Sequence, residues 1–307
     1  MRILITGGAG FIGHYLATYL TTLGHDVTCL DNLSRASKDA VDILRNNGIE
    51  LIVSDVTDFN SLSAAVGLVR PDVIVHAAAL ISVEESLEKP KEYFEVNFMG
   101  TLNVVRAMER FNVSRIIYVS SAAVYGNPVK LPINEDHPTN PRSPYGLSKL
   151  FGEGVVKLFS QLNNFEHIIL RLFNVYGPRQ KLTHYSGVIV KFVHNVMNDL
   201  PLTIYGDGEQ TRDFIHVIDV CRAVELSLTT KHFNEIYNVG SGVPTSIKEL
   251  ANMVQSIKKS KAGIVYEPPR AGDILHSYAD ISKATKLLGF RPSINIVDGI
   301  KELLKLR

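Results

Sequence analysis

The sequence predicts an α/β fold, with a doubly wound parallel sheet and a smaller, interleaved C-terminal domain. Up to residue 173, short apolar runs rich in β-branched residues alternate with longer segments of helical periodicity. The runs are continuously apolar, as in strands covered on both faces, and strands that alternate with helices form right-handed βαβ units. After about residue 174, glycine, proline and tyrosine interrupt this rhythm at 176–178 and 205–208, which indicates a second part of the chain.

The elements of the sheet can be placed in order along the chain. The predicted strands are Arg2–Thr6, Val27–Leu30, Leu51–Val53, Val73–His76, Arg115–Ser120, His167–Phe173 and, late in the chain, Ile236–Val239. The late run indicates that the chain crosses back to the first sheet. We therefore expect residues 1–173 and 212–242 to form one domain and residues 174–211 and 243–307 to form the other.

Composition excludes several classes of protein. The chain has 307 residues, and its 45% hydrophobic and 21% charged residues are usual for a globular protein. Because 32 basic residues face 31 acidic ones, a net charge of +1 offers no surface for nucleic acid. No apolar run approaches the roughly 18 residues of a membrane-spanning helix. Cys29 and Cys221 are too few for a disulfide framework or a thiolate metal site, so we expect no metal, reduced thiols and a cytoplasmic location.

A glycine-rich turn follows the first predicted strand. Gly7, Gly10 and Gly13 stand in this turn, and a helical stretch then runs to Gly24. Glycine lets the backbone turn tightly and approach a pyrophosphate, which the free N–H groups and the dipole of a helix N-terminus favour. Tight turns also use glycine without a ligand, but here a strand precedes and a helix follows, as dinucleotide binding requires.

Acidic or small residues end the next strands. Asp31 would accept hydrogen bonds from the adenosine ribose and repel a 2′-phosphate, which favours NAD, although Arg35 nearby leaves NADP open. Asp55 would either meet the adenine or cap a helix. The three alanines at 77–79 would let a cofactor lie close, or serve packing alone.

A tyrosine and a lysine at helical spacing carry the predicted chemistry. Ser143 as N-cap and Pro144 at the first helical position begin a helix that stacks Tyr145 and Lys149 on one face. A free tyrosine has a pKa of about 10, but a neighbouring ammonium, the positive helix end and a cationic nicotinamide would lower the pKa of Tyr145 and make it a base. Such pairs are common on ordinary helices. Ser121, at the end of the fifth strand, makes the combination specific, because it can hydrogen-bond the reacting hydroxyl.

These motifs resemble the extended short-chain dehydrogenases/reductases, and most closely the UDP-glucose (galactose) 4-epimerase group. The resemblance extends from residue 6 to residue 273. It implies a Rossmann-type domain that binds NAD, a domain that binds a nucleotide sugar, and Ser121, Tyr145 and Lys149 as catalytic residues. The further NAD contacts that it implies are Phe11, Ile12, Asp31, Asn32, Asp55, Val56, Ala77, Ala78, Ala79, Leu80, Asn97 and Phe173.

The same resemblance implies residues for the substrate. Asn174 should hold the sugar nucleotide, Arg212 and Arg270 should bind its diphosphate, and Asp273 should face its ribose. Arginine suits this task because its rigid fork pairs two phosphate oxygens, although an ion pair with the neighbouring aspartate is the alternative for Arg212. Ser277 should line the sugar cavity, where its small side chain would admit an N-acetyl group.

The implied reaction is the NAD-dependent 4-epimerisation of a UDP-hexose through a transient 4-keto sugar. Related dehydratases and decarboxylases carry an acid just after the hydroxyl residue that corresponds to Ser121, where this chain has Ala122 and Ala123, which argues against both reactions. Ile81 stands where some epimerases have a lysine near the nicotinamide. The alternatives are a UDP-glucuronate 4-epimerase, a net NAD(P)-dependent reductase or dehydrogenase of a nucleotide sugar, and a non-catalytic NAD-sensing scaffold.

Two predicted helices are apolar nearly all round. They span residues 91–111 and 144–162. A helix on a sheet needs only one apolar stripe, so a second stripe indicates burial against another surface. We expect a homodimer that packs these helices into a four-helix bundle, with burial by the C-terminal part of the same chain as the alternative.

Overall fold

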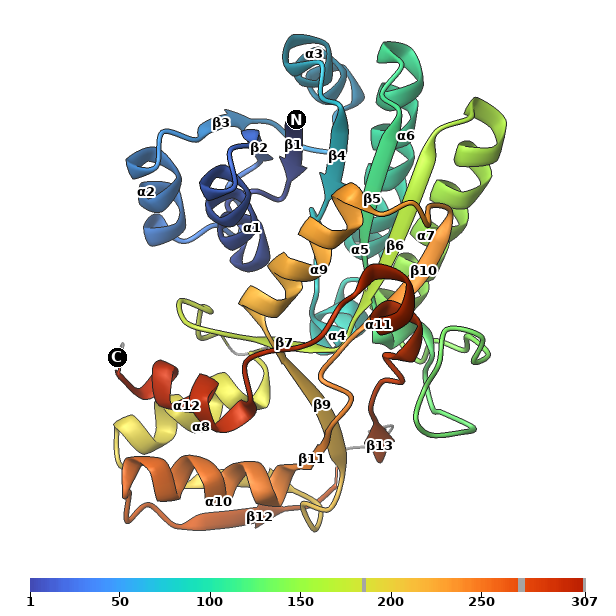
Figure 1. Ribbon diagram of the computed structural model, residues 1–307. Coiled ribbons are helices and arrows are strands. Elements are labelled where there is room, and N and C mark those ends of the chain that lie inside the picture. Colours follow the sequence, from blue (N-terminus) through green and yellow to red (C-terminus); the bar gives the residue numbers. More distant parts are fainter. Residues whose placement is uncertain (184–185, 270–273, 306–307) are drawn as a thin grey trace.

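The computed structural model describes residues 1–183, 186–269 and 274–305, and its largest element is a sheet of seven parallel strands (Figure 1). The strands lie side by side in the order β10-β6-β5-β4-β1-β2-β3. Their bounds are β1 (Arg2–Thr6), β2 (Asp26–Asp31), β3 (Glu50–Val53), β4 (Val73–His76), β5 (Arg115–Ser121), β6 (Glu166–Leu172) and β10 (Glu235–Val239). The parallel, doubly wound fold predicted from the sequence is confirmed, and each predicted strand is present with its ends within one residue.

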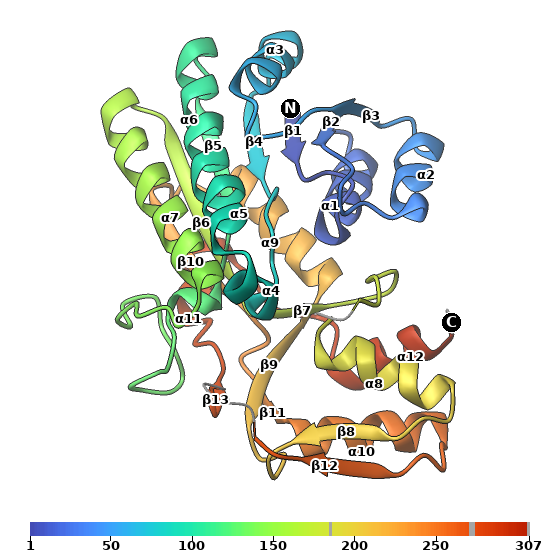
Figure 2. The same ribbon diagram turned by 180° about the vertical axis from the view of Figure 1, so that it is seen from behind.

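Helices cover both faces of this sheet, as the two opposite views show (Figures 1 and 2). Successive residues of a strand point to opposite faces, so in β1 Ile3 and Ile5 enter one hydrophobic core while Leu4 enters the other. On the first face lie α1 (Phe11–Thr22), α2 (Lys38–Asn46), α9 (Val217–Thr229) and α11 (Ser282–Leu288). On the second face lie α3 (Phe59–Val69), α6 (Gly100–Phe111) and α7 (Pro144–Asn163).

The predicted helix 91–111 is interrupted. It consists of α5 (Pro90–Tyr93), a π-helical segment (Phe94–Met99) and α6, and the short helix α4 (Val83–Glu88) precedes it. The π-helical segment contains Asn97, whose side-chain amide bonds both the N–H and the carbonyl of Leu80. A wider turn of this kind inside a helix is frequent at functional sites. The sequence pattern did not predict it, because the apolar spacing on its two sides is still that of a helix.

The C-terminal part forms a smaller lobe below the large sheet (Figure 1). One small sheet contains β7 (Asn174–Tyr176), β9 (Thr211–His216), β11 (Pro244–Ser246) and β13 (His276–Ser277), and a second one pairs β8 (Leu202–Tyr205) with β12 (Ile264–Glu267). The helices of this lobe are α8 (Val188–Met197), α10 (Ile247–Lys258) and α12 (Ile296–Lys305). Phe192, Leu202, Leu250 and Ile300 are buried in its core.

The chain passes repeatedly between the two lobes. β9 lies in the smaller lobe, but α9 packs on α1, and β10 pairs with β6 at the edge of the large sheet. The buried carboxylate of Asp213, on β9, fixes the next crossing, because it accepts bonds from the N–H groups of Ser241, Gly242 and Ala279 at 2.6, 2.9 and 3.1 Å. In the ranges that the structure describes, no helix is both long and apolar enough to cross a membrane.

Candidate active site

The glycine-rich turn lies at the centre of the carboxyl edge of the large sheet, between β1 and α1. A Cβ atom at Gly7 would lie 2.7 Å from the Cα of Ala78, and one at Gly13 would lie 2.0 Å from the carbonyl oxygen of Gly7. Gly7 also has a positive φ of 71°. No side chain caps α1 at Gly10, so the N–H groups of its first turn face the edge where a pyrophosphate would lie. This close-packed, uncapped turn fits a dinucleotide.

Two carboxylates at the ends of β2 and β3 lie beside this turn. Asp31 accepts hydrogen bonds from the N–H groups of Ala9 and Leu33 at 3.0 and 2.8 Å, which fixes it against the turn. Asp55 accepts a bond from the side chain of Asn32 at 2.7 Å. The helix-capping role that the sequence left open for Asp55 belongs instead to Asp58, which caps α3. Both oxygens of Asp55 have protein partners, since Oδ1 accepts bonds from the N–H and the hydroxyl of Thr57 at 2.8 and 2.7 Å, and its contact with NAD stays a prediction.

A cavity of about 620 Å³ opens beside Asp55. Residues on both sides of the glycine-rich turn line it, and we call it the cofactor cavity. They include Arg35, Asp55, Leu80, Val96, Met99 and Asn103. Its acidic and apolar walls fit an adenosine. Arg35, which left NADP open, is paired here with Glu85 through an Nη2–Oε1 contact of 2.7 Å.

Small residues and buried hydrogen bonds shape the edge after β4. Ala77 and Ala78 bond with their N–H groups to Thr6, so the chain stays close to the turn. His76 is fully buried beneath them, with Nδ1 2.6 Å from the hydroxyl of Thr6 and Nε2 3.0 Å from that of Thr101. Asn97 is also buried and bonded to protein groups, so its side chain positions Leu80, and its contact with NAD stays a prediction.

The three predicted catalytic residues meet where β5 ends and α7 begins. Ser143 caps α7 as predicted, by accepting a bond from the N–H of Gly146 at 3.1 Å. The helix brings Tyr145 next to Ser121, whose side chain acts to lower the pKa of the Tyr145 phenol. Lys149 is buried one turn further on, with its Nζ 4.4 Å above the ring of Tyr118. The structure thus brings together the residues that the sequence singled out.

The electrostatics of this group differ from the expectation. Desolvation raises the pKa of Tyr145, and its hydrogen bond with Ser121 only partly offsets this. Burial lowers the pKa of Lys149 to about 7, and the nearby Glu153 acts in the opposite direction. The predicted lowering of the pKa of Tyr145 invoked the nicotinamide as well as Lys149 and stays a prediction, whereas in the protein alone burial dominates the pKa of both groups.

A buried ion pair between Glu153 and Arg171 lies next to Ser120, the neighbour of Ser121 in β5. Glu153 on α7 binds Arg171 on β6 with two hydrogen bonds, of 2.9 and 2.7 Å, and both side chains are almost completely buried. The other partner of Glu153 is the hydroxyl of Ser120, at 2.6 Å. This network ties β5, β6 and α7 together and so fixes the distance between Ser121 and Tyr145.

The substrate residues predicted from the resemblance that the structure describes lie on strands of the smaller lobe, with Asn174 on β7, Arg212 on β9 and Ser277 on β13. Phe173, a predicted NAD contact, is buried after β6, and the side chain of the predicted substrate residue Asn174 bonds to the carbonyl of Asp213 at 2.9 Å. Arg212 donates to the carbonyls of Thr211 and Leu275, and Ser277 on β13 pairs with it in register. Because the carboxylate of Asp213 is bound by backbone N–H groups, it fixes loops in the smaller lobe. Arg270 and Asp273 lie outside the described residues.

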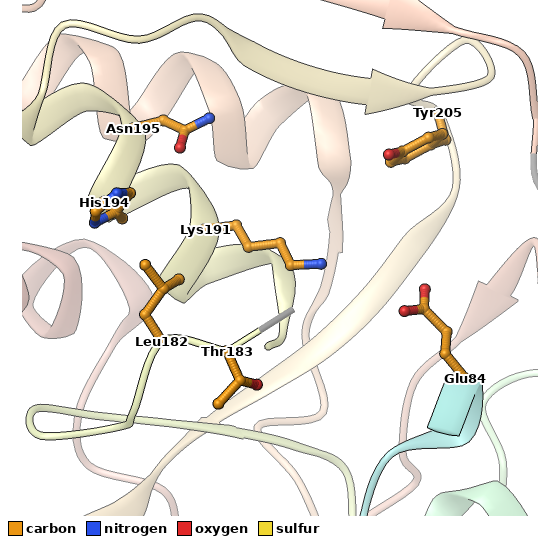
Figure 3. A pocket seen from close by; sticks show the side chains of 7 residues that line it. All are labelled: Glu84, Leu182, Thr183, Lys191, His194, Asn195 and Tyr205. Carbon is orange, nitrogen blue, oxygen red and sulfur yellow. The ribbon is translucent and has the colours of Figure 1, made fainter. Parts of the chain in front are cut away.

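A second cavity, of about 550 Å³, lies between α4 and the smaller lobe (Figure 3). Its lining residues are Glu84, Leu182, Thr183, Lys191, His194, Asn195 and Tyr205. The Lys191 ammonium points into it, toward the open space between Glu84 and Tyr205 (Figure 3). Sequence reasoning missed this cavity because Glu84 is far along the chain from the other lining residues, which lie between Leu182 and Tyr205 and form no local motif. Helix α4 stands between the two cavities, with Glu84 lining this one and Glu85 paired to the rim of the cofactor cavity.

Comparisons with known proteins agree with this geometry. Residues 3–240 match the family described as "NAD dependent epimerase/dehydratase family". A putative UDP-glucose 4-epimerase from Methanocaldococcus jannaschii is 39% identical, over 98% of this chain and 97% of the relative. The structure of a UDP-glucose 4-epimerase from Thermotoga maritima with UDP-glucose has a TM-score of 0.95, 33% identity, and coverage of 100% of this chain and 98% of the other. That of Thermus thermophilus UDP-glucose 4-epimerase with NAD has a TM-score of 0.92, also at 33% identity, with coverage of 100% and 98%.

Proposed function

The chain belongs to the NAD dependent epimerase/dehydratase family and is an NAD-dependent enzyme related to UDP-sugar 4-epimerases, and we propose that it inverts C4 of a UDP-hexose. UDP-glucose and UDP-galactose are the proposed pair, with UDP-N-acetylglucosamine and UDP-N-acetylgalactosamine as further substrates. The observation that carries the proposal is the group of Ser121, Tyr145 and Lys149 beside a turn that fits a dinucleotide.

Each residue of the site has a defined task in this reaction. When bound, NAD would supply a reversible hydride acceptor at C4, so that the sugar passes through a 4-keto form and no external reductant is consumed. Tyr145 removes the proton of the 4-hydroxyl and later returns it to the opposite epimer. Ser121 bonds the same hydroxyl and holds it toward Tyr145. Lys149, together with the positive nicotinamide, supplies the positive charge that offsets the cost of burying a tyrosinate.

The residues after Ser121 favour epimerisation over elimination. Ala122 and Ala123 lie in the single helical turn Ala122–Val124, close to the reacting group. Elimination of water from the sugar needs a general acid there, and two methyl groups have no proton to give. We therefore propose a reaction that starts and ends with an intact hydroxyl at C4.

The substrate is held at its nucleotide end, away from C4. Asn174, Arg212, Arg270 and Asp273 are the proposed contacts of the nucleotide and diphosphate. The proposed substrate domain is residues 174–211 with 243–307, although β9 also lies in the smaller lobe and α11 packs on the large sheet. Binding strength placed on the diphosphate leaves the sugar free to turn over and present its other face. A location in the cytoplasm is part of the same proposal and accords with buried, unpaired Cys29 and Cys221.

The decisive experiment is a panel of UDP- and dTDP-sugars, with the configuration of each product read by NMR. Inversion at C4 of UDP-glucose or UDP-galactose, without net change of nicotinamide absorbance, is the expected result. A stoichiometric change of absorbance would indicate a net reductase or dehydrogenase instead. Turnover limited to sugars with a C6 carboxylate would indicate a UDP-glucuronate 4-epimerase. No bound nicotinamide and no inversion of any sugar would refute the proposal.

The size of Ser277 makes a separate prediction about the sugar. Ser277 is partly buried beside Arg212, and its small side chain leaves room for a 2-N-acetyl group. Replacing it with tyrosine should lower kcat/KM for UDP-N-acetylglucosamine about tenfold or more while sparing UDP-glucose, because only the larger substituent would clash. Parallel assays of both sugars with Ser277→Tyr and Ser277→Ala measure this. Equal losses for both sugars in Ser277→Tyr would show that Ser277 does not select the 2-substituent.

A further inference from the structure

An ion pair connects two segments that lie on opposite sides of the glycine-rich turn. Arg35 follows β2, and Glu85 lies on α4, which follows β4. In the sheet, β1 lies between β2 and β4, and the turn begins where β1 ends. The 2.7 Å contact of Arg35 Nη2 with Glu85 Oε1 therefore bridges the edge of the sheet at the place where a dinucleotide would lie.

Glu85 is held firmly in this position. Its side chain is only 7% exposed, its N–H is bonded to Ser82, and its Oε2 accepts a bond from the hydroxyl of Tyr93 at 3.2 Å. The ring of Tyr93 in turn stands edge-on to that of Tyr145, with centroids 6.3 Å apart. The pKa of Glu85 is held below its ordinary value, mainly by its bond with Arg35, so the carboxylate is charged at neutral pH.

Arg35 is the movable partner. Its side chain is 54% exposed, while one side of it lines the cofactor cavity together with Asp55 and Leu80. The guanidinium can thus swing into solvent without disturbing the core, whereas Glu85 stays in place. An arginine that is free on one side and paired with a fixed, largely buried carboxylate on the other forms a removable bridge.

We propose that the Arg35–Glu85 ion pair is a clasp that retains NAD in its groove between turnovers. Arg35 and Glu85 are positioning residues in this role, because they close the groove over the cofactor without touching the reacting atoms. The inference rests on the proposed NAD-dependent epimerisation, in which the cofactor must be regenerated in place. Retention would require that the guanidinium move aside before NAD leaves.

The test measures release of NAD from the full-length protein in the absence of any sugar. The protein is loaded with radiolabelled NAD, excess unlabelled NAD is added, and the remaining label is followed with time. Arg35→Met and Glu85→Gln should each release NAD roughly three- to tenfold faster, the range that loss of one ordinary hydrogen bond gives, because the half-exposed Arg35 side chain weakens the ion pair. The double variant should release it no faster than the faster single variant, because the two residues act as a pair.

Controls separate the clasp from a structural role. Arg45→Met removes an exposed arginine on α2, whose pair with Asp42 lies within one helix, and should leave release unchanged. Arg35 is exposed, so Arg35→Met should keep the melting temperature of the NAD-free protein, and a higher salt concentration should speed release from wild type only. Release from Arg35→Met at the wild-type rate would overturn the proposal even if the enzyme epimerises UDP-sugars. Faster release in a protein that inverts no sugar would instead sustain the clasp and refute the epimerase.

Discussion

Burial decides how the residues around Tyr145 titrate. Lys149 lies against the ring of Tyr118, where desolvation brings its pKa to about 7, and Tyr145 has its pKa raised for the same reason. Lys149, the lysine of the proposed catalytic pair, therefore has a pKa close to neutral pH. A positive nicotinamide would act in the opposite direction on the pKa of Tyr145 and so favour the tyrosinate.

Removal of the Tyr145 hydroxyl should abolish the proton transfer and little else. Tyr145→Phe keeps the ring and its edge-on contact with Tyr93. We expect kcat to fall by about 10²- to 10⁴-fold, the usual contribution of a general acid–base group. NMR assays of epimerisation measure the loss, and the NAD content and melting temperature serve as controls that should not change. A variant with wild-type kcat would assign the proton to another group.

His76 makes stability depend on pH. Its pKa is lowered to about 3 by complete burial, so below pH 6.5 the unfolded chain binds a proton that the native protein does not. Stability is therefore fully present above pH 6.5 and is lost as the pH falls toward 3. This group alone should cost about 2 kcal/mol between pH 7 and 5.

Urea midpoints at several pH values measure the effect of His76. His167, whose pKa is lowered to about 4, contributes in the same direction and is left intact. His76→Gln should reduce the slope of stability against pH by about one proton, whereas the exposed His232→Gln should not. An unchanged slope in His76→Gln would mean that His76 is already protonated in the native protein.

Local spacing explains which site residues the sequence could predict. Ser121, the glycines and the Tyr145–Lys149 pair follow strands or share a helix face, so position along the chain reveals them. The Arg35–Glu85 pair and the cavity around Lys191 join segments far apart in sequence, and no local pattern marks them. The rise in the pKa of Tyr145 in the protein alone could not be predicted from the sequence, because it depends on burial by several elements at once.

At the scale of elements, the turn between β1 and α1 leaves no room for a side chain at position 7 or 13. A Cβ at position 13 would meet the carbonyl oxygen of Gly7, a backbone atom that cannot move aside cheaply. Gly13→Ala should lower the free energy of unfolding by about 1–3 kcal/mol and reduce the NAD content after purification. Gly263→Ala is the matched control, since no atom lies within 4 Å of its Cβ. Full NAD content in Gly13→Ala would show that the close packing of the turn is not needed for NAD binding.

The large sheet could be predicted from its continuous apolar runs, whereas the short polar strands of the smaller lobe could not be predicted. The inner strands of the parallel sheet are recognisable because both their faces are buried, and the edge strand β3, whose Val53 is 64% exposed, is recognisable by its apolar run alone. β11 and β13 have three and two residues and exist only through their pairing with β9. Such strands form only because the fold places a partner strand beside them, so neither composition nor periodicity predicts them.

At the scale of the whole molecule, the π-helical segment Phe94–Met99 and α7 form an apolar surface that is partly exposed. The rings of Phe94 and Phe98 pack on that of Phe151, which is 44% exposed, and Leu158 and Leu162 continue the surface along α7 with 53% and 66% exposure. A monomer rarely leaves such a surface uncovered, so we propose that a second copy covers it in a homodimer.

The dimer is tested by a charge at its proposed centre. Leu158→Lys should shift the mass in light scattering at micromolar concentration from dimer to monomer, because an unpaired ammonium would be buried in the interface. Leu68→Lys on α3, where the side chain is 74% exposed, should leave the mass unchanged. A wild-type mass equal to one chain would rule out the homodimer.

The late return of β10 to the large sheet has a consequence for biosynthesis. β6 can pair with β10 only after the ribosome has added the segment between Leu172 and Glu235, most of which belongs to the other lobe. Until then the backbone N–H and C=O groups along one edge of β6 have no partner strand. Such an exposed strand edge favours aggregation and binding by chaperones. A stop codon placed between the lobes would therefore yield insoluble polypeptide rather than a minimal cofactor-binding module.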